Sequence, residues 1–363
     1  MLELDVQTQA SAPSTGVRIR VHGPADLPLE LDRLGTYCEG RAPCPLSVHP
    51  AWLSVLQGSL RHTPYCVEAT EDGHIRGLLP LCFVSSFLFG RFLVSLPYVN
   101  YGGTMADDDR VAGLLIDRAV QMAQDLKVRY LELRHEVNLA HPSLTGRACD
   151  KVNMRRPLPG DADELWRRLD SSVRNQVRKG RKHGLTVHWG SQELLAEFYD
   201  VFARNMRDLG TPVYSRKLFQ FTLQQFGTRA ELCVVRGEGR CVAAALLLHG
   251  CGVTEVPSAS SLRKFNHTNA NMLMYWHLLE RAIERRQSVF DFGRCSVDSN
   301  THRFKKQWGA EPTPAQWQYH TLDGEVGAMR ASNPRYQRMI GLWKRLPVRL
   351  TRWLGPLVVR GIP

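Results

Sequence analysis

The alternation of apolar and polar residues along the chain predicts the same order of elements twice. In the first half it predicts a helix, a hairpin of two strands, a third strand, a second helix and a fourth strand, over residues 49–60, 65–70, 75–84, 92–97, 108–126 and 129–133. In the second half two helices precede the same series, over residues 191–209, 216–226, 231–235, 241–248, 252–258, 271–286 and 288–292. Residues at matching positions hardly agree, so the repeat is one of topology. It predicts an α/β fold of two similar units, each a mixed central sheet flanked by helices.

A linker between the two units is predicted near residues 150–159, where Pro157 and Pro159 are followed by Gly160. We therefore divide the chain into a first domain (1–155), a second domain (156–325) and a C-terminal tail (326–363), with the active site expected in the second domain. A chain of 363 residues is long enough for two domains of ordinary size.

The composition is that of a globular protein, with 43% hydrophobic and 23% charged residues. The sequence has no apolar run long enough to span a bilayer, and residues 1–14 lack the basic start and apolar core of a signal peptide. We expect a cytoplasmic protein. Nine cysteines are scattered without a Cys-x-x-Cys pair, which favours reduced thiols over disulfides or zinc. No metal site is expected.

The net charge of +12 is concentrated in part in the C-terminal tail. No acidic residue follows Glu325, whereas eight cationic residues do: Arg330, Arg335, Arg338, Lys344, Arg345, Arg349, Arg352 and Arg360. They are interleaved with apolar residues, and Pro347 and Pro356 interrupt the segment. One interpretation is a basic amphipathic tail in peripheral contact with an anionic membrane, at the inner face of that membrane. The other is a C-terminal helix that packs on the body with its arginines in solvent.

A second basic segment lies between the two units. Apolar residues at helical spacing predict a helix over residues 162–183, and Arg174, Arg178 and Arg181 project from one of its faces. These guanidinium groups could together hold a phosphate or diphosphate; the alternative is an ordinary solvated basic helix. Sequence-specific DNA binding is not expected, because the chain has no zinc-finger, RNP or basic-zipper pattern.

The end of the last predicted strand carries the densest group of charged residues. Asp291 lies within the strand, Gly293 and Arg294 follow it, and Lys305 and Lys306 come after a polar loop. A strand that stops at glycine and leads into a cation-rich loop is typical of ligand sites at the carboxyl edge of a sheet. The alternative is an ordinary exit from a strand with solvated lysines.

Two motifs give these segments a family context. The sequence Phe-Lys-Lys-Gln-Trp-Gly (304–309), soon after Asp-Phe-Gly-Arg (291–294), resembles the closing motif of the FemAB-like transferases, a branch of the GCN5-related N-acetyltransferase (GNAT) fold. Arg-Asn-Gln-Val-Arg-Lys (174–179) resembles the helix that opens the second domain of that family. Residues 198–213 also resemble this family. With all three segments, the chain looks closest to the FemAB-like proteins associated with exosortase/PEP-CTERM and exopolysaccharide gene systems.

This resemblance implies tandem GNAT-like domains and an enzyme that transfers an acyl or aminoacyl group to an amine of a cell-envelope or exopolysaccharide precursor. It implies no tightly bound cofactor, and acyl-CoA or aminoacyl-tRNA as the donor co-substrate. A tRNA acceptor end therefore stays open as a partner, contacted mainly through its phosphates. Two alternatives are a CoA-dependent N-acyltransferase acting on an amino sugar or small amine, and a non-catalytic factor that binds polysaccharide or envelope precursors.

The resemblance also implies roles for individual residues. Lys305 would stabilise the oxyanion or the donor phosphate, and Asp291 and Arg294 would position the substrate. Arg174 and Arg178, with the neighbouring Asn175, would bind a diphosphate.

In the GNAT fold the donor phosphates lie where the fourth strand leads into the next helix. The corresponding residues 260–271 lack the Arg-x-x-Gly-x-Gly/Ala motif of CoA binding, and offer instead the side chains Lys264, His267, Asn269 and Asn271. Glu255 on the preceding strand is a candidate general base, with an exposed strand residue as the alternative. Tyr101, in the matching loop Asn-Tyr-Gly-Gly (100–103) of the first half, is a candidate ligand contact.

Overall fold

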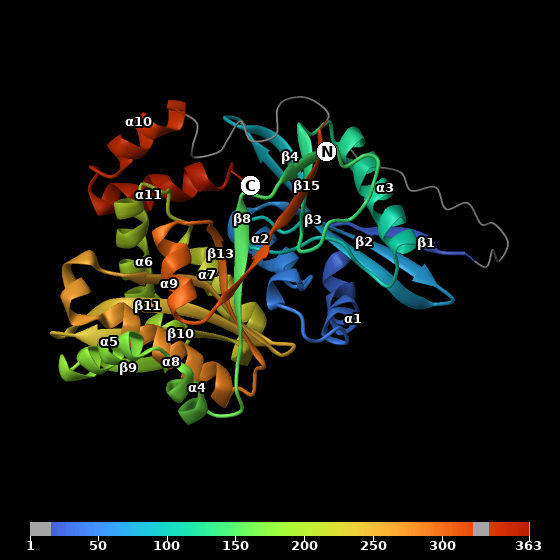
Figure 1. Ribbon diagram of the computed structural model, residues 1–363. Helices are drawn as coiled ribbons and strands as arrows, with labels where there is room; N and C mark the ends of the chain where they lie inside the picture. The colour runs from blue at the N-terminus through green and yellow to red at the C-terminus, as the bar shows by residue number, and fades with distance from the viewer. Residues whose placement is uncertain (1–15, 322–333, 363) are drawn as a thin grey trace.

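Two mixed β-sheets form the framework of the protein (Figure 1). The computed structural model describes residues 16–321 and 334–362. The first sheet has the order β1-β2-β3-β4-β6-β15-β7, with β5 beside β3, and the second has the order β14-β8-β13-β12-β11-β10-β9. The strands of the first sheet are β1 (Arg18–His22), β2 (Thr63–Glu71), β3 (His74–Ser86), β4 (Gly90–Val94), β5 (Met105–Ala106), β6 (Tyr130–His135), β7 (Gly146–Ala148) and β15 (Gln316–Thr321). Those of the second are β8 (Lys151–Pro157), β9 (Thr186–Gly190), β10 (Ala230–Gly237), β11 (Arg240–Gly250), β12 (Val253–Ser261), β13 (Val289–Ser296) and β14 (Glu311–Pro314).

Helices cover both faces of each sheet. The α-helices are α1 (Leu27–Glu39), α2 (Trp52–Leu60), α3 (Asp109–Asp125), α4 (Ala162–Arg168), α5 (Ser171–Lys182), α6 (Leu195–Leu209), α7 (Arg216–Phe226), α8 (Ala270–Glu284), α9 (Asn300–Gln307), α10 (Pro334–Trp343) and α11 (Val348–Val359). Short 3-10 helices are η1 (Leu46–Val48), η2 (Gln192–Leu194), η3 (Gly227–Arg229) and η4 (Arg263–Thr268). Helices α1 and α2 from the first half share one hydrophobic core with α6 and α7 from the second. The two halves are therefore joined through a common layer of helices.

Alternation along the central strands decides which core each side chain enters. On β10, Leu232 and Val234 lie in the core shared with the first half, whereas Cys233 and Val235 lie in the core that α5 and α8 cover. Successive strand residues point to opposite faces, and both faces are buried here. This is why the sequence shows a continuous apolar run in this strand. The same alternation later places Asp291, between the buried Phe290 and Phe292, on the face toward the first half.

The predicted α/β repeat is confirmed, because each half contains the hairpin, strand, helix and strand in the expected order. The linker interpretation of residues 150–159 is wrong for most of that segment, since β8 occupies 151–157 and pairs with β13 in the second sheet. Strand β15 then returns to the first sheet and pairs with β6. Figure 1 shows β8 and β15 running through the middle of the molecule. The division at residue 155 would thus fall inside a strand.

Part of the C-terminal tail packs on the body, as one of the two interpretations predicts. Thr351, Gly355 and Val359 of α11 are buried, and the Arg352 guanidinium donates to Asp200 on α6 (Nη1–Oδ1 3.0 Å). Residues 326–333 lie outside the described residues. Within the parts of the chain that the structure describes, no helix is both long enough and apolar enough to cross a membrane.

Candidate functional site

Strands β12 and β13 pair in parallel for a short distance and then separate. Three residue pairs join them, Val253 with Val289, Thr254 with Phe290 and Glu255 with Asp291. Beyond that point β12 continues beside β11, and β13 beside β8. The register of β13 shifts between Asp291 and Arg294, where Gly293 has a φ of +74°. Only glycine takes this conformation at no steric cost, and the bulge sets the backbone beyond Asp291 at a new angle.

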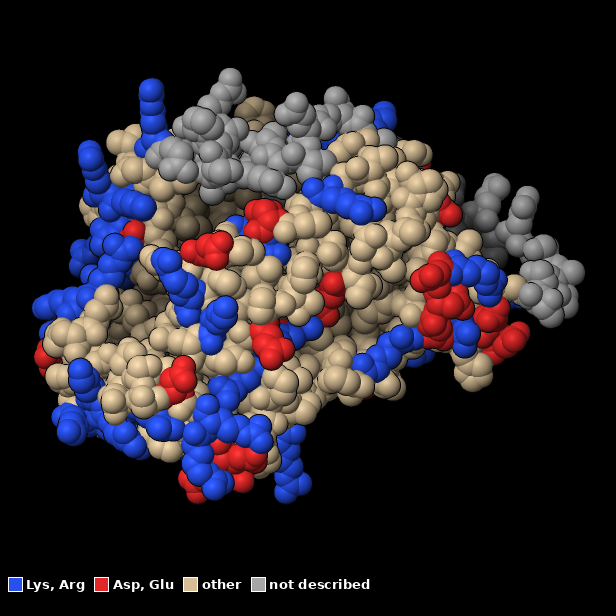
Figure 2. Space-filling model, viewed as in Figure 1, with Lys and Arg blue, Asp and Glu red and all other residues tan. Residues whose placement is uncertain are grey.

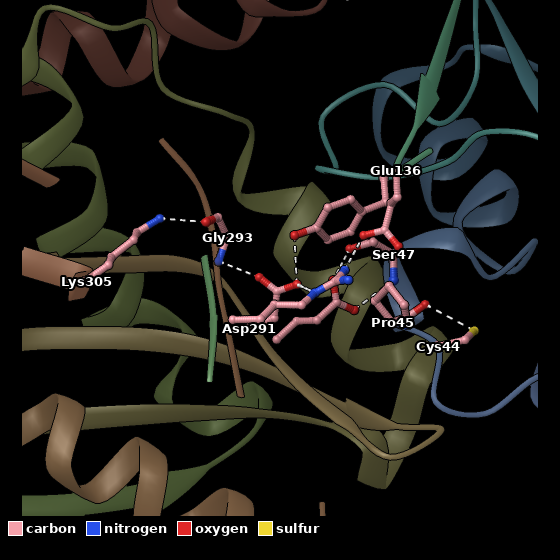
Figure 3. A network of polar contacts seen from close by, with 10 residues as sticks. Cys44, Pro45, Ser47, Glu136, Asp291, Gly293 and Lys305 are labelled. Atoms are coloured by element: carbon pink, nitrogen blue, oxygen red, sulfur yellow. Dashed lines mark hydrogen bonds and ion pairs between the residues drawn. The ribbon is translucent and has the colours of Figure 1, made fainter. Parts of the chain in front are cut away.

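Asp291 is the centre of a buried polar network that joins the two halves (Figure 3). Its carboxylate accepts hydrogen bonds from the Tyr101 hydroxyl (2.7 Å), the Arg155 Nε (2.7 Å) and the Gly293 amide (2.6 Å). Arg155, on β8, also forms an ion pair with Glu136 and lies with its guanidinium 4.7 Å from the centre of the Tyr101 ring. Burial, with Asp291 adding to it, raises the pKa of Tyr101 well above its ordinary value, so this phenol remains a neutral donor.

Glu255 is buried beside Asp291 and is held by Ser47 from the first half. The Ser47 amide donates to one carboxylate oxygen (2.8 Å), and the Ser47 hydroxyl is bonded to the other. Burial and the neighbouring Asp291 raise the pKa of Glu255 to about 8, while the Ser47 hydrogen bonds partly oppose the shift. The interpretation of Glu255 as an exposed strand residue is therefore wrong. A carboxyl with such a pKa changes protonation near neutral pH, as a general base does.

Lys305 is buried on helix α9, in a segment that the sequence predicted to be loop. The Ser299 hydroxyl accepts from the His302 amide (3.1 Å) and caps this helix. The Lys305 ammonium donates to the carbonyl of Gly293 (2.9 Å), just beyond Asp291 on β13 (Figure 3). It also donates to the next carbonyl, that of Arg294 (3.2 Å). No carboxylate of the described residues forms an ion pair with it, and burial lowers its pKa to about 8. An ammonium has three N–H donors, so one is left for a ligand.

Arg294 points toward strand β15. Its guanidinium lies 3.4 Å from the centre of the Trp317 ring, and the guanidinium of Arg134 lies 4.1 Å from the same ring. Burial, and then the charge of Arg134, lower the pKa of Arg294 to about 10. The predicted substrate contact of Arg294 stays a prediction.

The basic helix α5 lies apart from this network, because it packs on α8 across the opposite face of the sheet. The Arg174 guanidinium donates to the carbonyls of Leu169 (2.7 Å) and Arg167 (3.0 Å), which end helix α4. Through its Nη1, Arg174 therefore caps the end of α4, and a phosphate contact by its other guanidinium nitrogens stays a prediction. Arg178 is exposed; it donates to Asn175 (3.1 Å) and lies 5.5 Å from the Trp166 ring, so a phosphate contact there stays a prediction.

The segment between β12 and α8 forms η4 and gathers the predicted donor-binding residues. The ring of His267 lies 6.1 Å from that of His183 at the end of α5, and Asn269 has a φ of +56° immediately before α8. The N-cap residue Asn269 makes no side-chain capping hydrogen bond to α8, whose first turn contains Asn271. Lys264 lines a cavity of about 790 Å³ together with Arg240, Arg263 and residues of α6.

A smaller cavity of about 270 Å³ adjoins the Asp291 network on the side of the first half. Tyr101, Gly102, Gly103, His135 and Glu136 are among the residues that line it. A Cβ on Gly103 would come within 2.0 Å of the His135 ring, so glycine is required for this close approach. The loop 100–103 thus lines a cavity and is more than a turn.

Three residues of the network were not among the sequence predictions: Ser47, Glu136 and Arg155. Glu136 directly follows strand β6, and a carboxylate at the end of a strand is a signal that could have identified it. Ser47 and Arg155 reach the site only through contacts between distant segments, and no local pattern marks them.

A comparison with protein families places this site in a known domain type. Residues 167–306 match the family model described as "Acetyltransferase (GNAT) domain". The chain therefore carries a GNAT-type acetyltransferase domain, and Glu255, Asp291 and Lys305 all lie within it. No curated protein matches the sequence.

Solved structures extend the likeness to both halves. A crystal structure of FemX is 15% identical with a TM-score of 0.62, covering 85% of this chain and 98% of that one. L-PGS from Bacillus licheniformis is 15% identical with a TM-score of 0.55, covering 90% and 97%. A tandem GNAT protein from the clavulanic acid biosynthesis pathway is 11% identical with a TM-score of 0.50, covering 85% and 100%. The predicted fold of tandem GNAT-like domains is confirmed, whereas the association with exosortase/PEP-CTERM systems stays a prediction.

Proposed function

We propose that the protein transfers an acyl or aminoacyl group from an activated donor to an amine. One observation carries this proposal: Glu255 and Asp291 face each other at the last pair of β12 and β13, and the Lys305 ammonium contacts the next carbonyls of β13. Glu255, which titrates near neutral pH, and the buried Lys305, which has no ion-pair partner among the described residues, thus lie where β12 and β13 separate. Both residues are within the GNAT-type domain.

In the proposed reaction Glu255, as carboxylate, accepts a proton from the ammonium of the acceptor. The free amine attacks the carbonyl carbon of the donor, and the Lys305 ammonium stabilises the oxyanion that forms. The C–N amide bond forms as the C–S or C–O bond to the donor breaks, and the leaving thiol or hydroxyl takes up a proton. Asp291 holds Tyr101 and Arg155 in place through the hydrogen bonds described above. It thereby positions Tyr101, which lines the cavity on the side of the first half.

Acyl-CoA is the co-substrate that GNAT-type domains use, and the start of α8 suits its phosphates. Uncapped amides at a helix N-terminus attract anions, and Lys264, His267 and Asn269 lie in the segment that leads to them. Aminoacyl-tRNA is the alternative donor, because its phosphates would meet the same groups.

The acceptor amine would enter the cavity beside Tyr101 and Glu136. Its volume of about 270 Å³ is slightly below the range of about 300–1,000 Å³ for small-molecule sites, so it suits the amine-bearing end of a larger molecule. The Glu136 carboxylate lies in the cavity lining, held by its ion pair with Arg155, where an incoming ammonium would meet it. We propose an amino group on a phosphate-bearing envelope or exopolysaccharide precursor as acceptor. Arg178, on the opposite face of the sheet, stays a separate candidate contact for a substrate phosphate.

The test is acceptor-dependent release of CoA from a panel of acyl-CoAs, and of tRNA from labelled aminoacyl-tRNA, with amino sugars and nucleotide-linked amino sugars as acceptors. We expect one donor to be consumed faster when an amine is present, and an amide product of matching mass. Lys306 is exposed and adjacent to the buried Lys305, so Lys306→Ala is the matched control for Lys305→Ala. Binding of precursors without turnover of any donor would instead favour a non-catalytic role.

A further inference from the structure

Helix α11 is oriented with its small residues inward and its large apolar residues outward. The buried residues of this helix are Thr351, Gly355 and Val359, with Gly355 against Val213, whereas Trp353 and Leu357 are 68% and 66% exposed. Leu350 shares this outward side, because positions 350, 353 and 357 follow helical spacing. A surface helix ordinarily turns its apolar side to the core. Among the described residues, the apolar side of α11 is therefore left without a packing partner.

Two neighbouring segments extend this apolar surface. At one end of α11, Gly361 lies against Ser86 and Phe89 of the turn between β3 and β4, whose tip residues Phe87 and Leu88 are almost fully exposed. At the other end, helix α10 lies against Gly210 and exposes Met339 and Leu342. We call these three segments, the turn 86–90 with α10 and α11, the apolar face.

The apolar face is bordered by cations and carries no acidic residue. Arg338, Lys344, Arg345, Arg349 and Arg360 are exposed on or between the two helices, and Arg91 and Arg129 flank the turn. The segments 86–91 and 334–362 contain no Asp or Glu. Figure 2 shows Lys and Arg side chains gathered at the upper left, where Figure 1 places α10 and α11.

We propose that the apolar face docks the protein on the surface of an anionic phospholipid bilayer. Aromatic and aliphatic side chains that alternate with Arg and Lys suit the boundary between headgroups and acyl chains. The arginines would contact lipid phosphates, while Trp353, Leu357, Phe87 and Leu88 insert. A second copy of this chain is disfavoured, because a symmetric contact would bring the cations of one face against the same cations of the other.

The proposal does not depend on the acyl transfer proposed above. The test uses the full chain and co-sedimentation with vesicles of phosphatidylcholine containing 30% phosphatidylglycerol, and with pure phosphatidylcholine vesicles. Wild type should pellet with the anionic vesicles and be released by high salt, since salt screens the charge attraction. The double variant Trp353→Ser/Leu357→Ser should lower the apparent affinity by about tenfold or more. Arg349→Gln/Arg360→Gln should lower affinity for anionic vesicles.

Matched controls keep the test specific. Leu29 is 87% exposed on α1, outside the apolar face, so Leu29→Ser should leave binding unchanged. Arg18→Gln/Arg20→Gln, on β1, removes the same charge elsewhere. Both variants of α11 change exposed residues, so an unchanged melting temperature should confirm folding. Equal pelleting of wild type and Trp353→Ser/Leu357→Ser would overturn the proposal. So would no pelleting of wild type, or a dimer in solution that the α11 variants dissociate.

Discussion

Each half of the molecule contains one pair of parallel strands that separates after three residue pairs. In the first half the pairs between β4 and β6 are Phe92 with Tyr130, Leu93 with Leu131 and Val94 with Glu132. In the second half, β12 and β13 end their pairing at Glu255 and Asp291. The same backbone arrangement therefore ends in one acid in the first half and in two facing acids in the second.

The two strand pairs differ most in how their charges are satisfied. In the first, Glu132 forms a buried ion pair with Arg134 (2.7 Å), and the same guanidinium donates to the Val99 carbonyl (2.8 Å). In the second, Glu255 is held by the amide and hydroxyl of Ser47, and Lys305 contacts carbonyls alone. Charges that compensate one another stabilise a fold, whereas an uncompensated buried acid and cation have shifted pKa values and remain available to a substrate.

The largest effect on stability should come from breaking the Glu132–Arg134 ion pair of the first half. Arg134→Gln would leave Glu132 buried without its partner, and we expect the free energy of unfolding to fall by about 3–5 kcal/mol. The dependence of the reaction rate on pH should stay unchanged. Urea denaturation measures the loss, with Arg91→Gln, at an exposed residue of β4, as the control. A changed pH profile in Arg134→Gln would mean that the first pair also takes part in the chemistry.

At the strand pair of the second half, Lys305 contacts β13, and Lys305→Ala should act mainly on the reaction rate. We expect kcat/KM to fall about 100- to 1000-fold, since a donor to the oxyanion is lost. Stability should change by no more than about 1–3 kcal/mol, because two carbonyls lose a hydrogen bond. Steady-state kinetics measure the effect on the rate and thermal melting measures the effect on stability, with Lys306→Ala as the reference variant. A loss of folding as large as the loss of rate would show that Lys305 is structural.

Glu255→Gln should remove the rise of the rate with pH. In the wild type the rate should increase through about pH 8 as Glu255 loses its proton, and decrease again as Lys305, also near pH 8, loses its own. We expect the variant to be about 100-fold slower at its best pH. Its control is Glu311→Gln, at an exposed residue of β14. A rising limb that persists in Glu255→Gln would assign the base to another group.

The raised pKa of Glu255 should also make the stability of the fold depend on pH. The folded pKa of Glu255 lies above its ordinary value of 4.5, so its contribution is fully present below that value and is lost as the pH rises through about 8. The free energy of unfolding of the wild type should therefore decrease across this window, and that of Glu255→Gln should decrease less. Denaturation at a series of pH values gives the comparison.

Substitutions of Arg174 and Arg178 on α5 should distinguish a residue that stabilises the fold from one that contacts a ligand. Arg174→Gln removes the donor to the end of α4 and should cost about 1 kcal/mol of stability. Arg178→Gln should leave stability unchanged and raise KM for a phosphate-bearing substrate. An unchanged KM in Arg178→Gln would mean that α5 is a solvated helix without a ligand.

Ser47→Ala should give the smallest effect. Its hydroxyl lowers the pKa of Glu255, so removing it should move the rising limb of the rate to higher pH by about 0.5–1 unit. The maximal rate should be nearly preserved, because Ser47 positions the base and does not touch the substrate. A loss of maximal rate without a shift of the limb would contradict this role.

The sequence determined the elements that local patterns specify. Periodicity predicted the duplicated α/β order and α7 at its full length, and the charged end of the last strand drew attention to Asp291 and Lys305, which the fold brings to the same part of β13. It missed helix α9, because its residues are polar and its start depends on the Ser299 cap. It also mistook β8 for a linker, because two prolines lie at its end and its pairing partners are far away in the chain.

Only the tertiary structure decided which of the polar residues belong to the site. Arg174 and Arg178 have the same residue type and face, yet one caps a helix and the other lies in solvent. Ser47, Tyr101 and Arg155 converge on Glu255 and Asp291 because a shared helical layer joins the halves and β8 crosses between them. Local sequence fixes which face of a strand a side chain occupies. The partner it meets there, and hence its pKa, depends on contacts between segments up to about two hundred residues apart, as in the 208-residue separation of Ser47 and Glu255.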